Sequence, residues 1–128
     1  MPYVFVDRIL ESVPGERAVG IKALSLGEEF FQDHFPGMPV LPGAMILEGF
    51  VQTARHCLAE LEGGHDQWIL DAVEHVKFNR FATPGMQIRL EVERDREEDG
   101  AVWFKGRALL EEETICRAKL AVRPRERA

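Results

Sequence analysis

Apolar and polar residues alternate along three stretches in the second half of the chain. A period of two is the pattern of a β-strand with one buried face. The apolar members are Ile88, Leu90 and Val92 in the first stretch, Val102, Phe104, Ala108 and Leu110 in the second, and Cys116, Ala118, Leu120 and Val122 in the third. The polar residues 97–100, Glu-Glu-Asp-Gly, lie between the first two stretches and suit a turn. The pattern therefore predicts an antiparallel meander.

The first half of the chain predicts a strand pair followed by one helix. Residues 3–10 and 17–25 flank the sequence Val-Pro-Gly-Glu at 13–16, and proline followed by glycine fits a tight turn. From Met45, apolar residues recur at spacings of four and three, which places them on one helical face that ends at Gly63-Gly64. These residues are Leu47, Val51, Ala54, Leu58 and Leu61.

One more strand is expected at residues 69–81, so a single helix faces about six strands. A curved antiparallel sheet wrapped around that helix buries the apolar faces of both. We therefore predict an α+β fold. The length of 128 residues fits one domain that spans residues 1–128.

Composition and charge narrow the function classes. The 45% hydrophobic and 30% charged residues are typical of a soluble globular protein. The net charge of -6 disfavours a nucleic-acid binder, because phosphate neutralisation needs a basic face. Asp7 and Arg8 precede any long apolar run, which predicts no signal peptide, no membrane span and a cytoplasmic location. Cys57 and Cys116 lie singly in apolar patterns, so buried free thiols are expected.

Residues 33–48, DHFPGMPVLPGAMILE, gather the side chains suited to chemistry. His34 is followed by a proline-rich segment with little backbone freedom. Gly43 lies at the expected helix start, where unpaired N–H groups and the helix dipole can stabilise a negative oxygen. Glu48 lies beside the apolar stripe, and Gln52 one turn later can hydrogen-bond to it. A histidine, a helix-start amide and a partly buried carboxyl group suit proton transfer beside a carbonyl.

Each of these residues also has an ordinary structural explanation when it is taken alone. A histidine before a proline turn is more often a loop or capping residue, and a helix glutamate is usually solvated. His56 and Glu60 are four residues apart, but two ligands are too few for a metal site. No metal and no cofactor is expected.

The combination in residues 33–52, DHFPGMPVLPGAMILEGFVQ, closely resembles the signature of the β-hydroxyacyl-acyl-carrier-protein dehydratases, a hotdog-fold family. The resemblance covers nearly the whole chain. VFVDR at 4–8 is similar to the family's first strand, FFQDHFPG at 30–37 to its active-site loop, and KFNR at 77–80 to a later strand. It implies a hotdog fold and dehydration of (3R)-hydroxyacyl thioesters to trans-2-enoyl thioesters in lipid synthesis.

The resemblance also implies residue roles. His34 and the acidic residue fourteen positions later, Glu48, would carry catalysis as base and acid. The oxyanion and substrate-binding residues would be Gly43, Gln52, Phe35, Phe78 and Phe81. The chain departs from the family at Gly49, where alanine is common, and at Phe81, where proline is usual.

Partners follow from the same resemblance. The substrate is an acyl thioester on an acyl-carrier protein, and the active form is a homodimer, or a trimer of such dimers, with each site shared between two subunits. Lys77, Arg80 and Arg123 are the basic residues expected to meet the acidic carrier protein. Two other functions stay open: a hotdog acyl-thioesterase, and a non-catalytic acyl-binding subunit.

Overall fold

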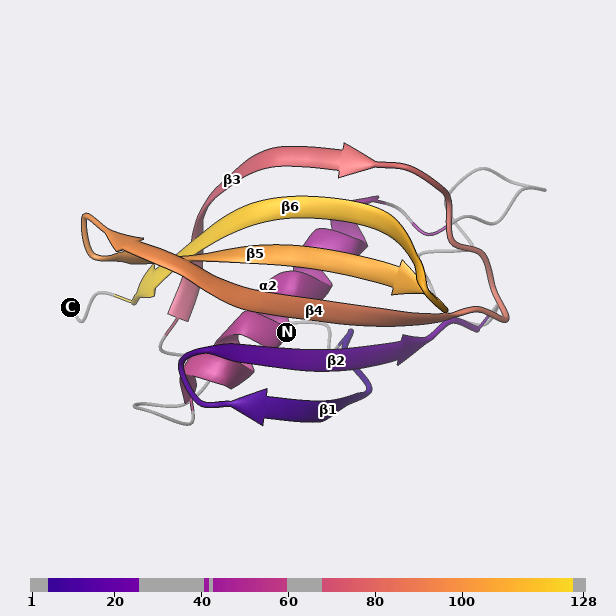
Figure 1. Ribbon diagram of the computed structural model, residues 1–128, viewed down its shortest axis with the longest axis horizontal. Coiled ribbons are helices and arrows are strands. Elements are labelled where there is room, and N and C mark those ends of the chain that lie inside the picture. Colours follow the sequence, from indigo (N-terminus) through magenta and orange to yellow (C-terminus); the bar gives the residue numbers. More distant parts are fainter. Residues whose placement is uncertain (1–4, 26–40, 42, 60–67, 126–128) are drawn as a thin grey trace.

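The computed structural model describes residues 5–25, 41, 43–59 and 68–125. These residues form six strands and one helix (Figure 1). The elements are β1 (Arg8–Val13), β2 (Arg17–Ala23), α2 (Gly43–Ala59), β3 (Trp68–Phe78), β4 (Gln87–Glu98), β5 (Ala101–Leu110) and β6 (Glu113–Pro124). No helix in the described ranges is long and apolar enough to cross a membrane.

The strands form one antiparallel sheet in the order β1-β2-β4-β5-β6-β3. Figure 1 shows this sheet curving around α2, which lies behind it in that view. The strands β4, β5 and β6 follow one another as the predicted meander, and β3 lies on the outer side of β6. The predicted α+β arrangement, with one helix on a curved antiparallel sheet, is confirmed.

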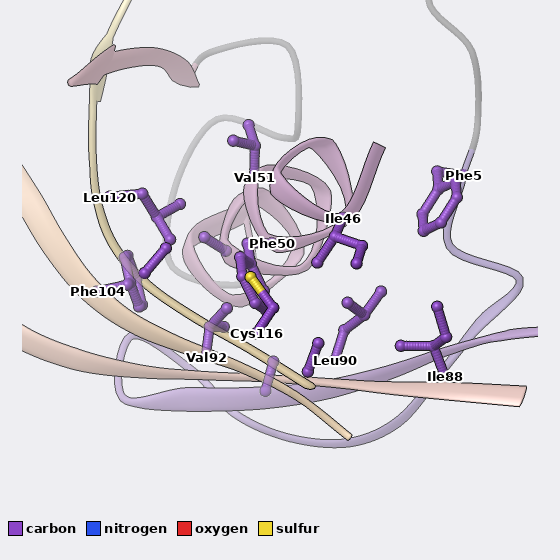
Figure 2. Packing of buried hydrophobic residues seen from close by; sticks show 14 of the residues in the cluster. Phe5, Ile46, Phe50, Val51, Ile88, Leu90, Val92, Phe104, Cys116 and Leu120 are labelled. Carbon is purple, nitrogen blue, oxygen red and sulfur yellow. The ribbon is translucent and has the colours of Figure 1, made fainter. Parts of the chain in front are cut away.

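The alternation in the sequence matches the two faces of the sheet. Ile88, Leu90 and Val92 of β4 are buried, and Figure 2 shows them beside α2. The turn between β4 and β5 uses Asp99 and Gly100, which both have positive φ. Positive φ at both central residues is the geometry of a two-residue hairpin whose twist matches its strands. The polar tip predicted at residues 97–100 is therefore confirmed.

The centre of the core is the contact between Phe50 of α2 and Gly106 of β5. Phe50 is fully buried, and a Cβ added at Gly106 would lie 2.9 Å from its ring. Such a distance is shorter than real Cβ contacts, so the helix approaches the sheet this closely only because residue 106 is glycine. The glycine thus sets how near α2 lies to β5.

Several boundaries differ from the sequence prediction. The first strand begins at Arg8 rather than residue 3, because the N–H groups of Phe5 and Val6 bind the side chain of Gln52. The helix begins two residues before Met45, while its predicted end at Gly63-Gly64 lies outside the described residues. The strand β3 ends at Phe78 instead of residue 81.

The edge strand β3 is irregular. Within the described residues it hydrogen-bonds only to β6, and its register shifts between Leu70 and Ala72 and again between Glu74 and Lys77. His75, inside the second shift, has a φ of 55°. Left-handed backbone is uncommon outside glycine and marks a distorted position in a strand. Large apolar side chains on this strand, Leu70, Val76 and Phe78, remain exposed.

The face of the sheet opposite α2 carries a network of charged side chains. Glu91 of β4 accepts hydrogen bonds from Arg107 Nη2 at 2.6 Å and from Arg89 Nε at 2.9 Å. Partial burial raises the pKa of Glu91, but the bonds from Arg107 and Arg89 outweigh that effect, so its pKa lies below the ordinary glutamate value. Glu91 therefore stays ionised at neutral pH and holds two arginines in place.

Both cysteines are buried free thiols, as the sequence predicts. Burial raises the pKa of the Cys116 thiol to about 11. A thiol of that pKa is almost wholly protonated at neutral pH and is a poor nucleophile. Cys116 therefore serves packing.

Candidate active site

An apolar pocket of about 350 Å³ lies at the amino end of α2. The backbone N–H of Leu41 donates to the carbonyl oxygen of Ala82 at 2.7 Å, which joins the chain before the helix to the chain after β3. The lining residues are Leu41, Gly43, Ile46, Phe78, Asn79, Arg80, Phe81 and Ala82. Three of the predicted site residues, Gly43, Phe78 and Phe81, thus meet in one pocket.

The helix start lies directly under the ring of Phe78. A Cβ at Gly43 would be 2.6 Å from Phe78 Cζ, so a larger residue would displace the ring or the helix. The first N–H groups of a helix have no partner within the helix and lie at the positive end of its dipole. Gly43 therefore places potential hydrogen-bond donors beside an apolar wall.

The two departures from the family pattern lie in different environments. Phe81 is 70% exposed at the pocket, where it adds an aromatic wall in place of the usual proline. Gly49 faces the core instead, since a Cβ there would lie 2.8 Å from Leu90 Cδ1 and 3.0 Å from the ring of Phe5. Only Phe81 contributes to the pocket.

The predicted pair of Glu48 and Gln52 is present on α2. Gln52 Nε2 donates to Glu48 Oε1 at 3.1 Å. The other end of the amide, Gln52 Oε1, accepts the backbone N–H groups of Phe5 at 2.8 Å and Val6 at 3.0 Å. Because N–H groups require an acceptor, they fix which end of the Gln52 amide faces them. The NH₂ group of Gln52 must then point toward Glu48.

The segment that orients Gln52 is itself held by β2. Asp7 Oδ2 accepts the N–H of Ala23 at 2.7 Å, and Asp7 Oδ1 lies 3.4 Å from Lys22 Nζ. The Lys22 side chain is only 8% exposed and its ammonium group lies 5.6 Å from the centre of the Phe5 ring. A buried ammonium needs such partners, so Asp7 and Lys22 support the position of residues 5–7.

The pocket and the Glu48 carboxyl group lie on different sides of the helix. Glu48 follows Gly43 by five positions, which corresponds to a rotation of about 140° around a helix. Glu48 does not line the pocket, and Phe50, two positions later, points to the opposite side, into the core. Two further predicted residues, His34 and Phe35, lie outside the described residues. One chain therefore presents the Gly43 pocket and the Glu48 pair separately.

Two of the three basic residues expected to meet a carrier protein are already paired. Arg80 binds Glu113, and Arg123 Nε lies 2.9 Å from Asp71 Oδ1. Lys77 forms no ion pair with the part of the chain that the structure describes. The pairing of Arg80 and Arg123 leaves Lys77 as the most available cation of the three.

Comparisons with known proteins agree with this architecture. The model of the FabA-like domain matches residues 1–119. A 3-hydroxyacyl-[acyl-carrier-protein] dehydratase FabZ of Chloroflexus aggregans is 39% identical over 120 residues, covering 93% of this chain and 83% of the relative. The protein of the same name from Variovorax paradoxus is 37% identical over 123 residues, covering 93% and 82%.

Solved structures show the same fold at low sequence identity. The dehydratase heterocomplex ApeI:P from Xenorhabdus doucetiae matches with a TM-score of 0.79 at 13% identity, over 97% of this chain and 84% of that one. Protein PH1136 from Pyrococcus horikoshii matches with a TM-score of 0.75 at 14% identity, over 97% and 86%. The hotdog fold implied by the sequence is confirmed. With a family model matched from residue 1 to 119 and relatives above 30% identity over nine-tenths of its length, the chain belongs to the FabA-like domain family.

Proposed function

We propose that this chain removes water from (3R)-hydroxyacyl thioesters carried on acyl-carrier protein and forms trans-2-enoyl thioesters in fatty-acid or related lipid synthesis. The observation that carries the proposal is the similarity over 93% of the chain to dehydratases named for that reaction. The apolar pocket beside the helix start suits an acyl chain, and the Glu48–Gln52 pair suits an acid.

In the proposed reaction His34 removes a proton from C2, and Glu48 supplies the proton with which the C3 hydroxyl group leaves as water. Neutral His34 takes a proton from C2, and the electron pair left there forms the double bond to C3. Glu48, as the neutral acid, gives its proton to the C3 hydroxyl group, which leaves as water. After the product leaves, protonated His34 releases its proton to solvent and the Glu48 carboxylate takes one from solvent, so both groups regain their starting states.

The reaction also requires a group that stabilises negative charge on the thioester oxygen. As the C2 proton leaves, this oxygen gains negative charge, and we assign the N–H of Gly43 to receive it. The supporting facts are the position of Gly43 at the start of α2 and the apolar wall of Phe78 against it. Hydrogen bonds in a site with little water stabilise such charge more strongly than they would in solution.

A complete site requires two copies of the chain in this proposal. The rotation of about 140° between Gly43 and Glu48 separates the pocket of one chain from its own acid. A second copy that packs against the Glu48 side of α2 would bring the missing carboxyl group to the pocket. The outer edge of β3, which pairs with no strand among the described residues and leaves Leu70 and Val76 exposed, is a suitable surface for this pairing.

A hydration assay with a small crotonyl thioester tests the reaction class. Dehydration is reversible, so the enzyme is expected to add water to the enoyl group while the thioester bond stays intact. Loss of enoyl absorbance without release of free thiol is the predicted result. Release of thiol would identify a thioesterase, and neither change would identify a non-catalytic subunit; both outcomes contradict the proposal.

The orientation of Gln52 gives a test that separates its two contacts. A glutamate at position 52 can still accept the N–H groups of Phe5 and Val6, but it cannot donate to Glu48. Gln52→Glu is therefore expected to keep slow hydrogen exchange at both amides and to lower kcat by about tenfold or more. Gln52→Ala should lose both the slow exchange and the activity. Full activity in Gln52→Glu would show that the donated hydrogen bond has no role in catalysis.

A further inference from the structure

Five cations lie together on the face of the sheet opposite α2, the face turned toward the viewer in Figure 1. Alternation along β5 and β6 buries Phe104, Ala108, Cys116 and Ala118 against the helix and turns the residues between them outward. We call this group the basic patch. It consists of Lys77 of β3, Lys105 and Arg107 of β5, and Arg117 and Lys119 of β6.

The register of the sheet places these cations directly opposite one another. Arg117 pairs across the strands with Lys77 on one side and with Arg107 on the other, and Lys105 is opposite Lys119. Like charges at directly opposed positions destabilise a sheet. This face carries three such pairs, although the net charge of the chain is -6. Because the pairs do not stabilise the fold, we look for a function of the charge.

Neighbouring carboxylates neutralise the basic patch only in part. Glu91 binds Arg107 but also Arg89, and Asp95 lies 3.8 Å from Lys105 and 4.0 Å from Lys119 but also binds Arg96. Glu74 is opposite Lys119 and Glu93 is opposite Lys105 in the sheet register. Neither of these two pairs of described residues forms an ion pair. In the described part of the chain, Lys77 and Arg117 have no carboxylate partner. An excess of positive charge therefore remains at the β3–β6 side.

The basic patch begins beside the candidate active site. Lys77 directly precedes Phe78, whose ring closes over Gly43 at the pocket. The other side of the pocket is less suitable for an acidic partner, because Arg80 there is paired with Glu113 beside Glu111 and Glu112. A negatively charged protein that carries the substrate is attracted to the basic patch. It is repelled by the side of the pocket with Glu111, Glu112 and Glu113.

We propose that the basic patch is the docking surface for the acidic carrier protein, which lies across β5, β6 and the end of β3 while its acyl arm enters the pocket past Phe78. This inference rests on the proposed function, in which the acyl group arrives on a carrier protein. Of the three docking residues expected from the sequence, the proposal keeps Lys77 and drops Arg80 and Arg123. It adds Lys105, Arg107, Arg117 and Lys119.

The test compares two double charge reversals with the same change in net charge. Arg117→Glu/Lys119→Glu alters the basic patch. Arg8→Glu/Arg94→Glu alters the edge strand β1 and the side of β4 that faces away from the basic patch, where Arg94 is opposite the buried Phe104. Each protein is assayed with the same acyl group on the carrier protein and on N-acetylcysteamine, an uncharged small thiol. Binding of the carrier protein alone is measured by titration at low and high salt.

The basic-patch variant is expected to lose about tenfold or more in kcat/KM for the carrier-bound substrate, through KM, with little change for the small thioester. It should also bind the carrier protein more weakly and with less salt dependence, while the control variant behaves like the wild type. Equal losses in both variants, equal losses on both substrates, or a changed oligomeric state in place of weaker binding would each overturn the proposal. If the wild type converts neither substrate, the proposed function fails, and the titration alone decides whether the basic patch binds the carrier protein.

Discussion

Replacing Glu48 by glutamine is expected to lower kcat by about a hundredfold or more while the protein stays folded. The substituted amide keeps an oxygen that can accept the hydrogen bond from Gln52 Nε2, now 3.1 Å long, but it has no acidic proton to give to the leaving hydroxyl group. The side chain at position 48 keeps its position and shape and loses only the acidic proton. Steady-state kinetics with a 3-hydroxyacyl thioester measure the effect.

A matched substitution distinguishes the loss of the acid from the loss of a charge. Glu97→Gln removes the same charge at the exposed end of β4 and should leave kcat unchanged. If Glu48→Gln retains near-normal turnover, Glu48 is not the acid. His34→Ala should be as inactive as Glu48→Gln.

Mixing the two inactive variants tests whether each site uses two chains. After subunit exchange, half of the dimers contain one variant of each kind, and each such dimer has one intact site, which predicts a recovery of about a quarter of the wild-type activity. Exchange is verified by mass spectrometry of differently tagged chains. No recovery after complete exchange would place His34 and Glu48 of one chain in the same site.

The second large effect is on stability. Phe50→Ala is expected to lower the free energy of unfolding by about 3–5 kcal/mol, because the ring is fully buried and its removal leaves a cavity between α2 and the sheet. Denaturation in urea, followed by circular dichroism, measures the change. Phe50→Leu, which keeps most of the apolar volume, should lose less than about 2 kcal/mol.

Gly106 provides the internal control for that prediction. Gly106→Ala alone should destabilise the protein by about 1–3 kcal/mol, because its Cβ would lie 2.9 Å from the Phe50 ring. In a Phe50→Ala background that ring is absent, so the same glycine substitution should have little effect. Additive losses in the double variant would contradict the close contact between the two positions.

Much of the fold is predictable from the sequence because each strand of the meander turns one face to the helix. That environment produces the period of two along β4 and in the middle of β5 and β6, although Trp103 and Ala121 on the other face are buried too. The start of β1 was predicted wrongly because Phe5 and Val6 have strand-like side chains, yet their N–H groups bind Gln52, 47 and 46 residues away. A local pattern does not contain a contact at that distance.

The same limit applies to the site. The spacing of Glu48 and Gln52 within a helix predicted their hydrogen bond correctly, since both lie on one turn. The anchoring of residues 5–7 by Asp7 and Lys22 was not predicted, because it depends on how β2 meets the N-terminal segment. The cations at 105 and 107 and at 117 and 119 are visible in the sequence as Lys-Gly-Arg and Arg-Ala-Lys. Only the register of β5 and β6 shows that they face one another.

The interruptions in β3 have a consequence for how chains of this kind behave when they are crowded. A strand edge with evenly spaced hydrogen-bonding groups can recruit further strands without end, which is how fibrils grow. The register shifts and the left-handed His75 break that even spacing. An edge of this shape matches only a strand interrupted at the same places, and among identical molecules that strand is another β3. Association through this edge would then stop at a dimer. The protein could keep an edge strand that pairs with another molecule without forming fibrils.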